Sequence, residues 1–175
     1  MSKQRPKAGK KTQMVDQLTD VQADLRNSLL DAGPDRWCLK LTPGTSLRPK
    51  LLPVLCNIMT LRRNQSKGEG MLLAPTPMWH SWRAAGWTKD PMSPIALAKH
   101  TAAGVDMKAA NLGTLVVDEL HLDSYHHKFL TAFDLLLEAN PTVFSCLVLP
   151  ATAGLPPDGL GALLAKHRYI LLDLK

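Results

Sequence analysis

The sequence lacks a long apolar run, and it has few cysteines. Among its 175 residues no apolar stretch approaches the roughly 20 residues that span a bilayer, and the first residues lack the apolar segment of a secretory signal. Its three cysteines, Cys38, Cys56 and Cys146, are odd in number and lie among apolar residues, as reduced core thiols do. These absences predict a soluble intracellular protein, nuclear or cytoplasmic, without a membrane span.

Two catalytic signatures are also missing. No GxGxxG follows an apolar run, which argues against the usual dinucleotide-binding turn. No GxSxG elbow is present to support a serine nucleophile. The classical oxidoreductase and hydrolase classes are therefore excluded.

Positive charge is in excess, and much of it lies in the first dozen residues. The formal net charge of +6 favours a polyanionic partner. The candidate nucleic-acid contacts in this basic arm, residues 1–13, are Lys3, Arg5, Lys7, Lys10 and Lys11. The arm could also bind an anionic membrane or serve as a nuclear import signal, and it could equally be a solvated, disordered terminus.

Hydrophobic periodicity predicts one α/β domain after an N-terminal helix. Apolar residues from Met14 to Leu29 recur at three- and four-residue spacing, which predicts an amphipathic helix over 14–33. From residue 34 to 175, short apolar runs alternate with helical segments. The expected strands are 37–41, 70–76, 114–120, 144–152 and 169–174, and the expected helices are 51–61, 77–85, 125–139 and 160–167. This order predicts an open, mostly parallel sheet of about five strands with helices on both faces.

The stretch Thr114 to Asp123, TLVVDELHLD, is the most informative in the chain. A buried strand that ends in Asp-Glu delivers two carboxylates to the carboxyl edge of a parallel sheet, where ligands bind in such folds. In a P-loop NTPase the first acid would hold Mg²⁺ and the second would orient the attacking water. Asp118 and Glu119 are the candidates for these catalytic roles, although such acids can also merely cap the following helix.

Four strand-end turns together resemble a known family. They are Thr42-Pro43-Gly44-Thr45-Ser46, Ala74-Pro75-Thr76, the Asp118 turn, and Pro150-Ala151-Thr152. Their order resembles motifs I, Ia, II and III in the first RecA-like domain of superfamily 2 helicases. The stretch Met71 to Trp87 looks most like the Swi/Snf-type remodelling ATPases, with Trp82 at the family's buried tryptophan. In that group the segment from Ile95 to His121 would hold a strand, a short helix and the acid-bearing strand.

The resemblance covers about Trp37 to Leu174 and implies a RecA-like P-loop NTPase fold with ATP and Mg²⁺ as ligands. Asp118 would contact the metal, and Thr76 would contact nucleic acid. The candidate nucleotide-binding residues are Gly44, Thr45, Ser46, Arg48 and Thr152. Hydrolysis in this family takes place between two RecA-like domains, so a partner protein would have to supply the second one.

The Walker A loop departs from the family pattern, since GxxxxGK[ST] is absent. One register places Ser46 at the last glycine, Leu47 at the lysine and Arg48 at the hydroxyl that binds the metal. The other places Gly44 at that glycine, Thr45 at the lysine and Ser46 at the hydroxyl. Neither register supplies the lysine. We therefore expect a degenerate domain with weak or absent ATPase activity.

Two further clusters have simpler explanations. His121, Asp123, His126 and His127 could form a zinc site, but an exposed polar loop explains their irregular spacing better. Trp79, Trp82 and Trp87 could stack on bases. Helical spacing instead predicts that Trp82 packs in the core and leaves Trp79 nearer the surface.

Three functions follow from these patterns. The first is a helicase-like domain that binds nucleic acid or a nucleoprotein partner. The second is a structural protein that packages nucleic acid through its basic arm. The third is a protein-interaction module on an inactive NTPase scaffold.

Overall fold

Five parallel strands form the centre of the molecule. A computed structural model describes residues 18–31, 35–42, 46–103, 111–118, 126–150 and 158–175. The strands are β1 (Arg36–Leu41), β2 (Glu69–Leu73), β3 (Leu112–Asp118), β4 (Phe144–Leu149) and β5 (Ile170–Leu174). Their order in the sheet is β2-β3-β4-β1-β5, and every pairing is parallel.

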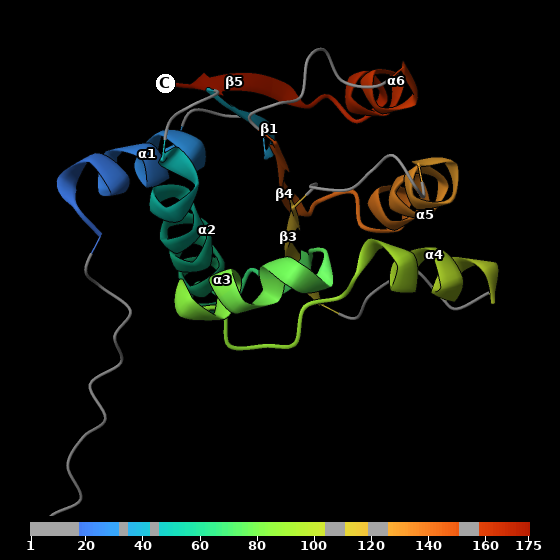
Figure 1. The fold of residues 1–175 in the computed structure, drawn as a ribbon, viewed down its shortest axis with the longest axis horizontal. Helices are drawn as coiled ribbons and strands as arrows, with labels where there is room; N and C mark the ends of the chain where they lie inside the picture. The colour runs from blue at the N-terminus through green and yellow to red at the C-terminus, as the bar shows by residue number, and fades with distance from the viewer. Residues whose placement is uncertain (1–17, 32–34, 43–45, 104–110, 119–125, 151–157) are drawn as a thin grey trace, which may run out of the picture.

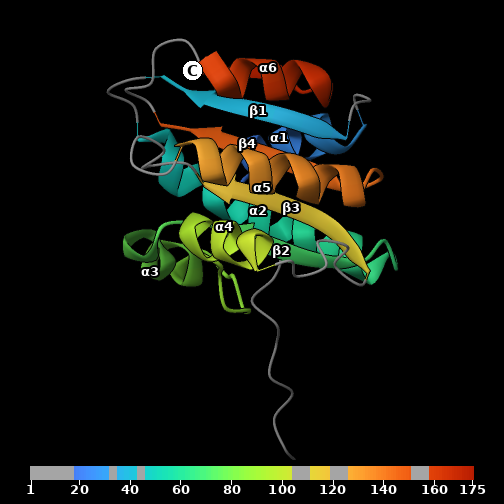
Figure 2. The same ribbon diagram turned by 90° about the vertical axis from the view of Figure 1, so that its right-hand side faces the viewer.

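Helices cover both faces of this sheet. The helices are α1 (Asp20–Asp31), α2 (Leu47–Asn64), the 3₁₀ helix η1 (Thr76–Met78), α3 (Trp79–Ala84), α4 (Pro94–Ala102), α5 (His126–Ala139) and α6 (Asp158–Lys166). The helices α1, α2 and α3 lie on one side of the sheet and α4, α5 and α6 on the other (Figure 1). Figure 2 shows α4, α5 and α6 side by side over their face of the sheet.

The central strands carry apolar side chains on both faces because both faces are covered. All six residues of β4 are buried, and so are the last six of the seven in β3. One core cluster joins α2, α3 and the sheet, and the other joins α4, α5 and α6 to the opposite face. The expected open α/β fold is thus confirmed, and its arrangement is consistent with a RecA-like domain.

Helix α2 is fastened to β3 through the core. Arg62, near the end of α2, donates from Nε to Thr114 Oγ1 at 3.2 Å and from Nη2 to the Gly113 carbonyl at 3.2 Å. Its guanidinium carbon lies 4.9 Å from the centre of the Phe144 ring. Burial lowers the pKa of Arg62 below its ordinary value, and the nearby Asp35 opposes this shift. The hydrogen bonds and the ring offset part of the cost of burying this cation.

The N-terminal helix packs against α2, as Figure 1 shows. Gln22 Nε2 donates to the Lys50 carbonyl at 2.7 Å, and Trp37 Nε1 in β1 donates to the Leu29 carbonyl at 3.0 Å. The helix begins at Asp20, six residues later than the apolar periodicity suggests, and the segments 1–17 and 32–34 lie outside the described residues. Val21 belongs to the predicted apolar stripe, yet it is 78% exposed.

One expected strand is absent from the described part of the chain. The resemblance implied a strand at the start of the segment from Ile95, but the structure has helix α4 there. Pro94 at the first turn and the side chain of Ser93, which accepts a hydrogen bond from the Ala96 amide at 3.1 Å, favour a helix start.

Within the described residues, no helix combines the length and the apolar character that crossing a membrane requires.

The cysteines are buried and should be unreactive. Cys38, Cys56 and Cys146 are all buried and form no disulfide among the described residues, as the sequence predicts. Burial raises the pKa of Cys56 to about 12 and raises that of Cys146 as well. Since the thiolate is the reactive form, we expect no labelling by a disulfide reagent at pH 8 in the folded protein and full labelling in denaturant. Rapid modification of any of the three thiols under native conditions would contradict this packing.

Candidate functional site

Four of the predicted site residues are described, and they end or follow strands at the carboxyl edge of the sheet: Ser46, Arg48, Thr76 and Asp118. In open α/β sheets, ligands bind beyond the carboxyl ends of the strands, at the point where neighbouring strands send their connections to opposite faces. Here these strands are β1, which leads to α2, and β4, which leads to α6 on the other face (Figure 1). The connecting residues 43–45 and 151–157 lie outside the described part of the chain.

Asp118 ends β3 at this edge and is fully buried. Its Oδ2 atom accepts a hydrogen bond from Trp82 Nε1 of α3 at 2.7 Å. The same oxygen accepts a hydrogen bond from Arg48 Nη2 of α2, which also forms an ion pair with it. One carboxylate therefore joins β3, α2 and α3.

Arg48 and Asp118 are unequally buried. The Arg48 side chain is 20% exposed, whereas that of Asp118 has no exposed surface. Among the described residues, Arg48 Nε and Asp118 Oδ1 are buried atoms without a hydrogen-bond partner. Removing Arg48 would therefore leave a fully buried charge uncompensated, whereas removing Asp118 would leave a cation that is partly exposed.

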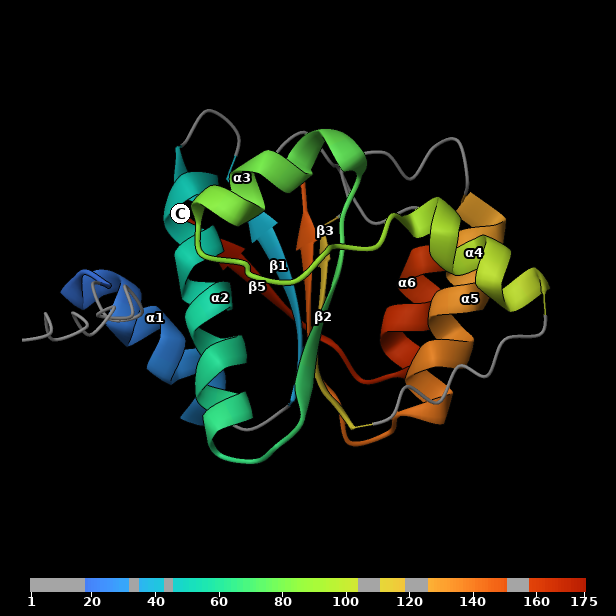
Figure 3. The ribbon, with the colours of Figure 1, turned by 90° about the horizontal axis from the view of Figure 1, so that it is seen from below.

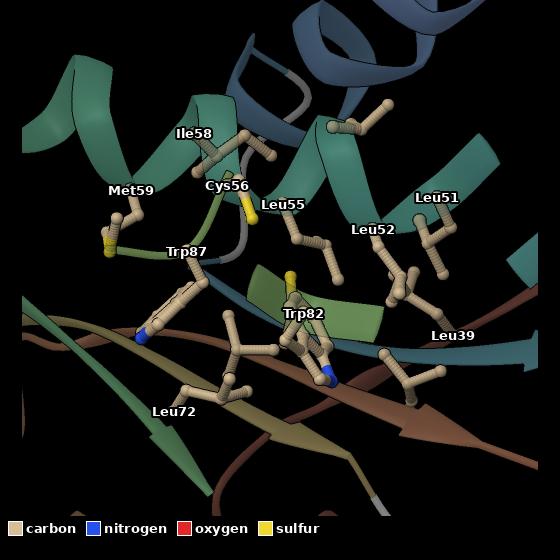
Figure 4. Packing of buried hydrophobic residues seen from close by; sticks show 14 of the residues in the cluster. Leu39, Leu51, Leu52, Leu55, Cys56, Ile58, Met59, Leu72, Trp82 and Trp87 are labelled. Carbon is tan, nitrogen blue, oxygen red and sulfur yellow. The ribbon is translucent and has the colours of Figure 1, made fainter. Parts of the chain in front are cut away.

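The tryptophan that binds Asp118 is part of the core. Trp82 has no exposed surface, and its ring meets that of Trp87 edge to face with centroids 5.9 Å apart. Figure 4 shows both rings packed with leucines and Met59 of the core between α2 and the sheet. The expected core position of Trp82 is confirmed. Trp79 is half-buried, and its Nε1 donates to the Ala74 carbonyl at 2.8 Å, so its polar edge already has a partner.

The described residues do not fit a Mg²⁺ ion. Magnesium prefers several oxygen ligands in an octahedral arrangement. Asp118 Oδ2 already accepts from a cation and an indole, and Oδ1 is buried. The guanidinium of Arg48 already pairs with this carboxylate, and no group of three potential metal ligands occurs among the described residues.

The other predicted site residues divide into two groups. Ser46 is exposed at the start of α2, and its side chain makes no capping hydrogen bond to that helix. Thr76 is exposed at the start of η1. The remaining predicted positions, Gly44, Thr45, Glu119, Thr152 and the five cations of the basic arm, lie outside the described residues, as do His121, Asp123 and the side chain of His126.

Sequence reasoning missed that Arg48 and Trp82 meet at Asp118. It treated Arg48 as a possible phosphate ligand and Trp82 as a core residue. One signal was present in the first Walker A register, which places Arg48 where the metal-binding hydroxyl belongs. A cation at that position is consistent with an ion pair to the strand-end acid, which the structure shows.

Comparisons with protein-family models and with curated proteins found no match to this chain. The fold and the site geometry therefore carry the functional argument alone.

Proposed function

We propose that this chain is a helicase-like RecA-type domain that binds nucleic acid or a nucleoprotein partner and has little or no ATPase activity of its own. The observation that carries the proposal is the contact between Arg48 and the buried strand-end acid Asp118. In an active P-loop NTPase this acid serves the metal ion. Here an arginine pairs with it, so a metal ion for phosphoryl transfer would lose this carboxylate.

The missing Walker A lysine supports the same conclusion independently. Phosphate binding in such loops needs the lysine charge as well as the backbone amides. The sequence lacks that lysine, and among the described residues the strand-end acid Asp118 is already paired with Arg48, so both losses weaken binding of the same phosphates. The scaffold would then act through its surfaces rather than through hydrolysis.

Nucleic-acid binding through the strand-end turns is the testable part of this proposal. We expect fluorescence anisotropy to detect binding of a labelled single-stranded oligonucleotide, and part of this binding should survive deletion of residues 1–13. ATP and Mg²⁺ should not change the affinity. Thr76→Glu places a negative charge at the exposed turn after β2 and should weaken binding, whereas Thr88→Glu, at another exposed threonine of the chain, should not.

Two outcomes of this experiment would favour the other functions. Binding that disappears completely without residues 1–13, and that falls steeply with salt, would support the packaging protein. No binding to the intact chain would support a protein-interaction module. Oligonucleotide binding that ATP stimulates, or efficient hydrolysis of ATP by the chain, would contradict the proposal directly.

A further inference from the structure

A groove lies between the amino-terminal half of α2 and α3, beside the contact between Arg48 and Asp118. Its volume is about 390 Å³, within the range of protein ligand pockets. Figure 3 shows α3 beside this part of α2. Most of its lining is aliphatic, from Pro49, Leu52, Pro53, Met78, Ala84 and Ala85.

The polar residues of the groove include one arginine and no acid. Arg48, His80 and Ser81 complete the lining, and none of the described residues that line the groove is acidic. Arg48 keeps part of its side chain exposed while only its Nη2 atom is bonded to Asp118. The apolar walls can therefore bind an apolar side chain, and a carboxylate beside it can share the exposed part of Arg48 with Asp118.

The electrostatic surroundings favour an acidic partner too. The first turn of α2 contains Arg48 and Lys50 and no acidic residue, so these cations add to the positive end of the helix dipole. Arg83 of α3 pairs with Asp90 at 3.0 Å, but their side chains are 55% and 92% exposed. A surface pair of this kind contributes little stability, so Arg83, which does not line the groove but precedes the lining residue Ala84 in α3, is able to exchange its partner for an incoming carboxylate.

The lining favours a peptide over a nucleobase. Proteins that bind single-stranded nucleic acid stack bases on aromatic rings. Among the described residues that line the groove, none is Phe, Tyr or Trp. Proline, leucine, methionine and alanine instead form the kind of surface on which a partner's apolar side chain is anchored.

We propose that the groove between α2 and α3 binds a segment of a partner protein in which an apolar side chain is flanked by Asp or Glu. This inference deepens the proposed function because it names the chemistry of the partner, and it does not require nucleic-acid binding. Thr76 does not line the groove, although Met78 of the same 3₁₀ helix does, so variants at Thr76 and at Ala84 are each measured with both ligands.

The test is a display selection of random 12-residue peptides on the intact chain, followed by anisotropy with a labelled peptide of the selected consensus. Ala84→Glu adds bulk and negative charge inside the groove. Ala165→Glu makes the same change at an exposed alanine of α6, on the other face of the sheet. Circular dichroism and thermal unfolding of both variants establish that they fold.

We expect selected peptides to combine apolar residues with Asp or Glu. Their affinity should fall by at least about tenfold in Ala84→Glu and stay unchanged in Ala165→Glu. A consensus without acidic residues, no selected peptide, or equal binding to both variants would overturn the inference. It would also be overturned if Ala84→Glu impaired oligonucleotide binding and left peptide binding intact, because the groove would then serve nucleic acid.

The oligonucleotide measurements on Thr76→Glu report the proposed function independently. Peptide binding that depends on Ala84, without any oligonucleotide binding, would retain the groove and reject the nucleic-acid part. Oligonucleotide binding that depends on Thr76, without peptide binding that depends on Ala84, would reject the peptide groove and leave the proposed function standing.

Discussion

Asp118→Ala should lower the free energy of unfolding by about 3 kcal/mol. The substitution removes the acceptor of both Trp82 Nε1 and Arg48 Nη2 and leaves a cation and an indole N–H at a buried position. Because Arg48 is partly exposed, we expect this loss of unfolding free energy to be near the lower end of the range for breaking a buried ion pair. Urea unfolding followed by tryptophan fluorescence measures the change and reports the surroundings of Trp82.

Asp173→Ala is the matched control because Asp173 is an exposed acid at the carboxyl end of β5. We expect it to change stability by less than about 0.5 kcal/mol. Asp118→Asn keeps an acceptor for Trp82 and should lose less stability than Asp118→Ala. Equal stability of Asp118→Ala and the wild type would show that the contact among α2, α3 and β3 does not hold the fold together.

Gly113→Ala should destabilise the fold by about 3 kcal/mol or more, at the upper end of overpacking effects. A Cβ at this position would lie 2.0 Å from the Lys67 carbonyl oxygen and 2.8 Å from Gly68 Cα. These are backbone atoms, so relief requires moving the turn between α2 and β2. Gly68 itself has a φ of +106°, a conformation that fixes this turn and that other residues rarely adopt.

Gly161→Ala provides the opposite expectation for the same chemical change. Gly161 lies within α6, and a Cβ there would meet no atom within 4 Å. Alanine should therefore stabilise the protein by up to about 1 kcal/mol through its higher helix propensity. Thermal and urea unfolding of the two variants side by side test both expectations, and a stable Gly113→Ala protein would refute the close approach at the start of β3.

Much of the fold could be predicted from the sequence because its main signals are local. The runs in β3 and β4 lack polar alternation, as strands covered on both faces do, and their carboxyl ends lie where the turn residues indicated. Helix α5 begins one residue after its predicted start and ends at the predicted residue, Ala139. Most apolar residues of these elements are buried, as the hydrophobic pattern predicts, although Leu135 of α5 is 40% exposed.

Two sequence predictions were wrong, because hydrophobic periodicity alone does not determine which residues are buried or where a strand begins. Val21 fits the apolar spacing of α1, but this short helix packs on α2 through other residues and leaves Val21 in solvent. The segment after Ile95 was assigned from the resemblance rather than from its own start signals. Pro94 and the Ser93 cap make it a helix.

The site could be predicted only in part. Asp118 was identified because it ends an apolar run, and it lies at the carboxyl edge of the sheet as expected. Its partners come from residues 70 and 36 positions away in the chain. No local pattern encodes a contact over such separations, because the distance depends on how α2 and α3 pack on the sheet.

The most direct test of the central claim, that Arg48 takes the place of a metal ion at Asp118, is equilibrium binding of a fluorescent ATP analogue in the presence of Mg²⁺ to the intact chain and to Asp118→Asn. We predict no saturable binding to either protein. Saturable binding to the intact chain that weakens in Asp118→Asn would show that the acid still serves a metal-bound nucleotide, and it would contradict the account.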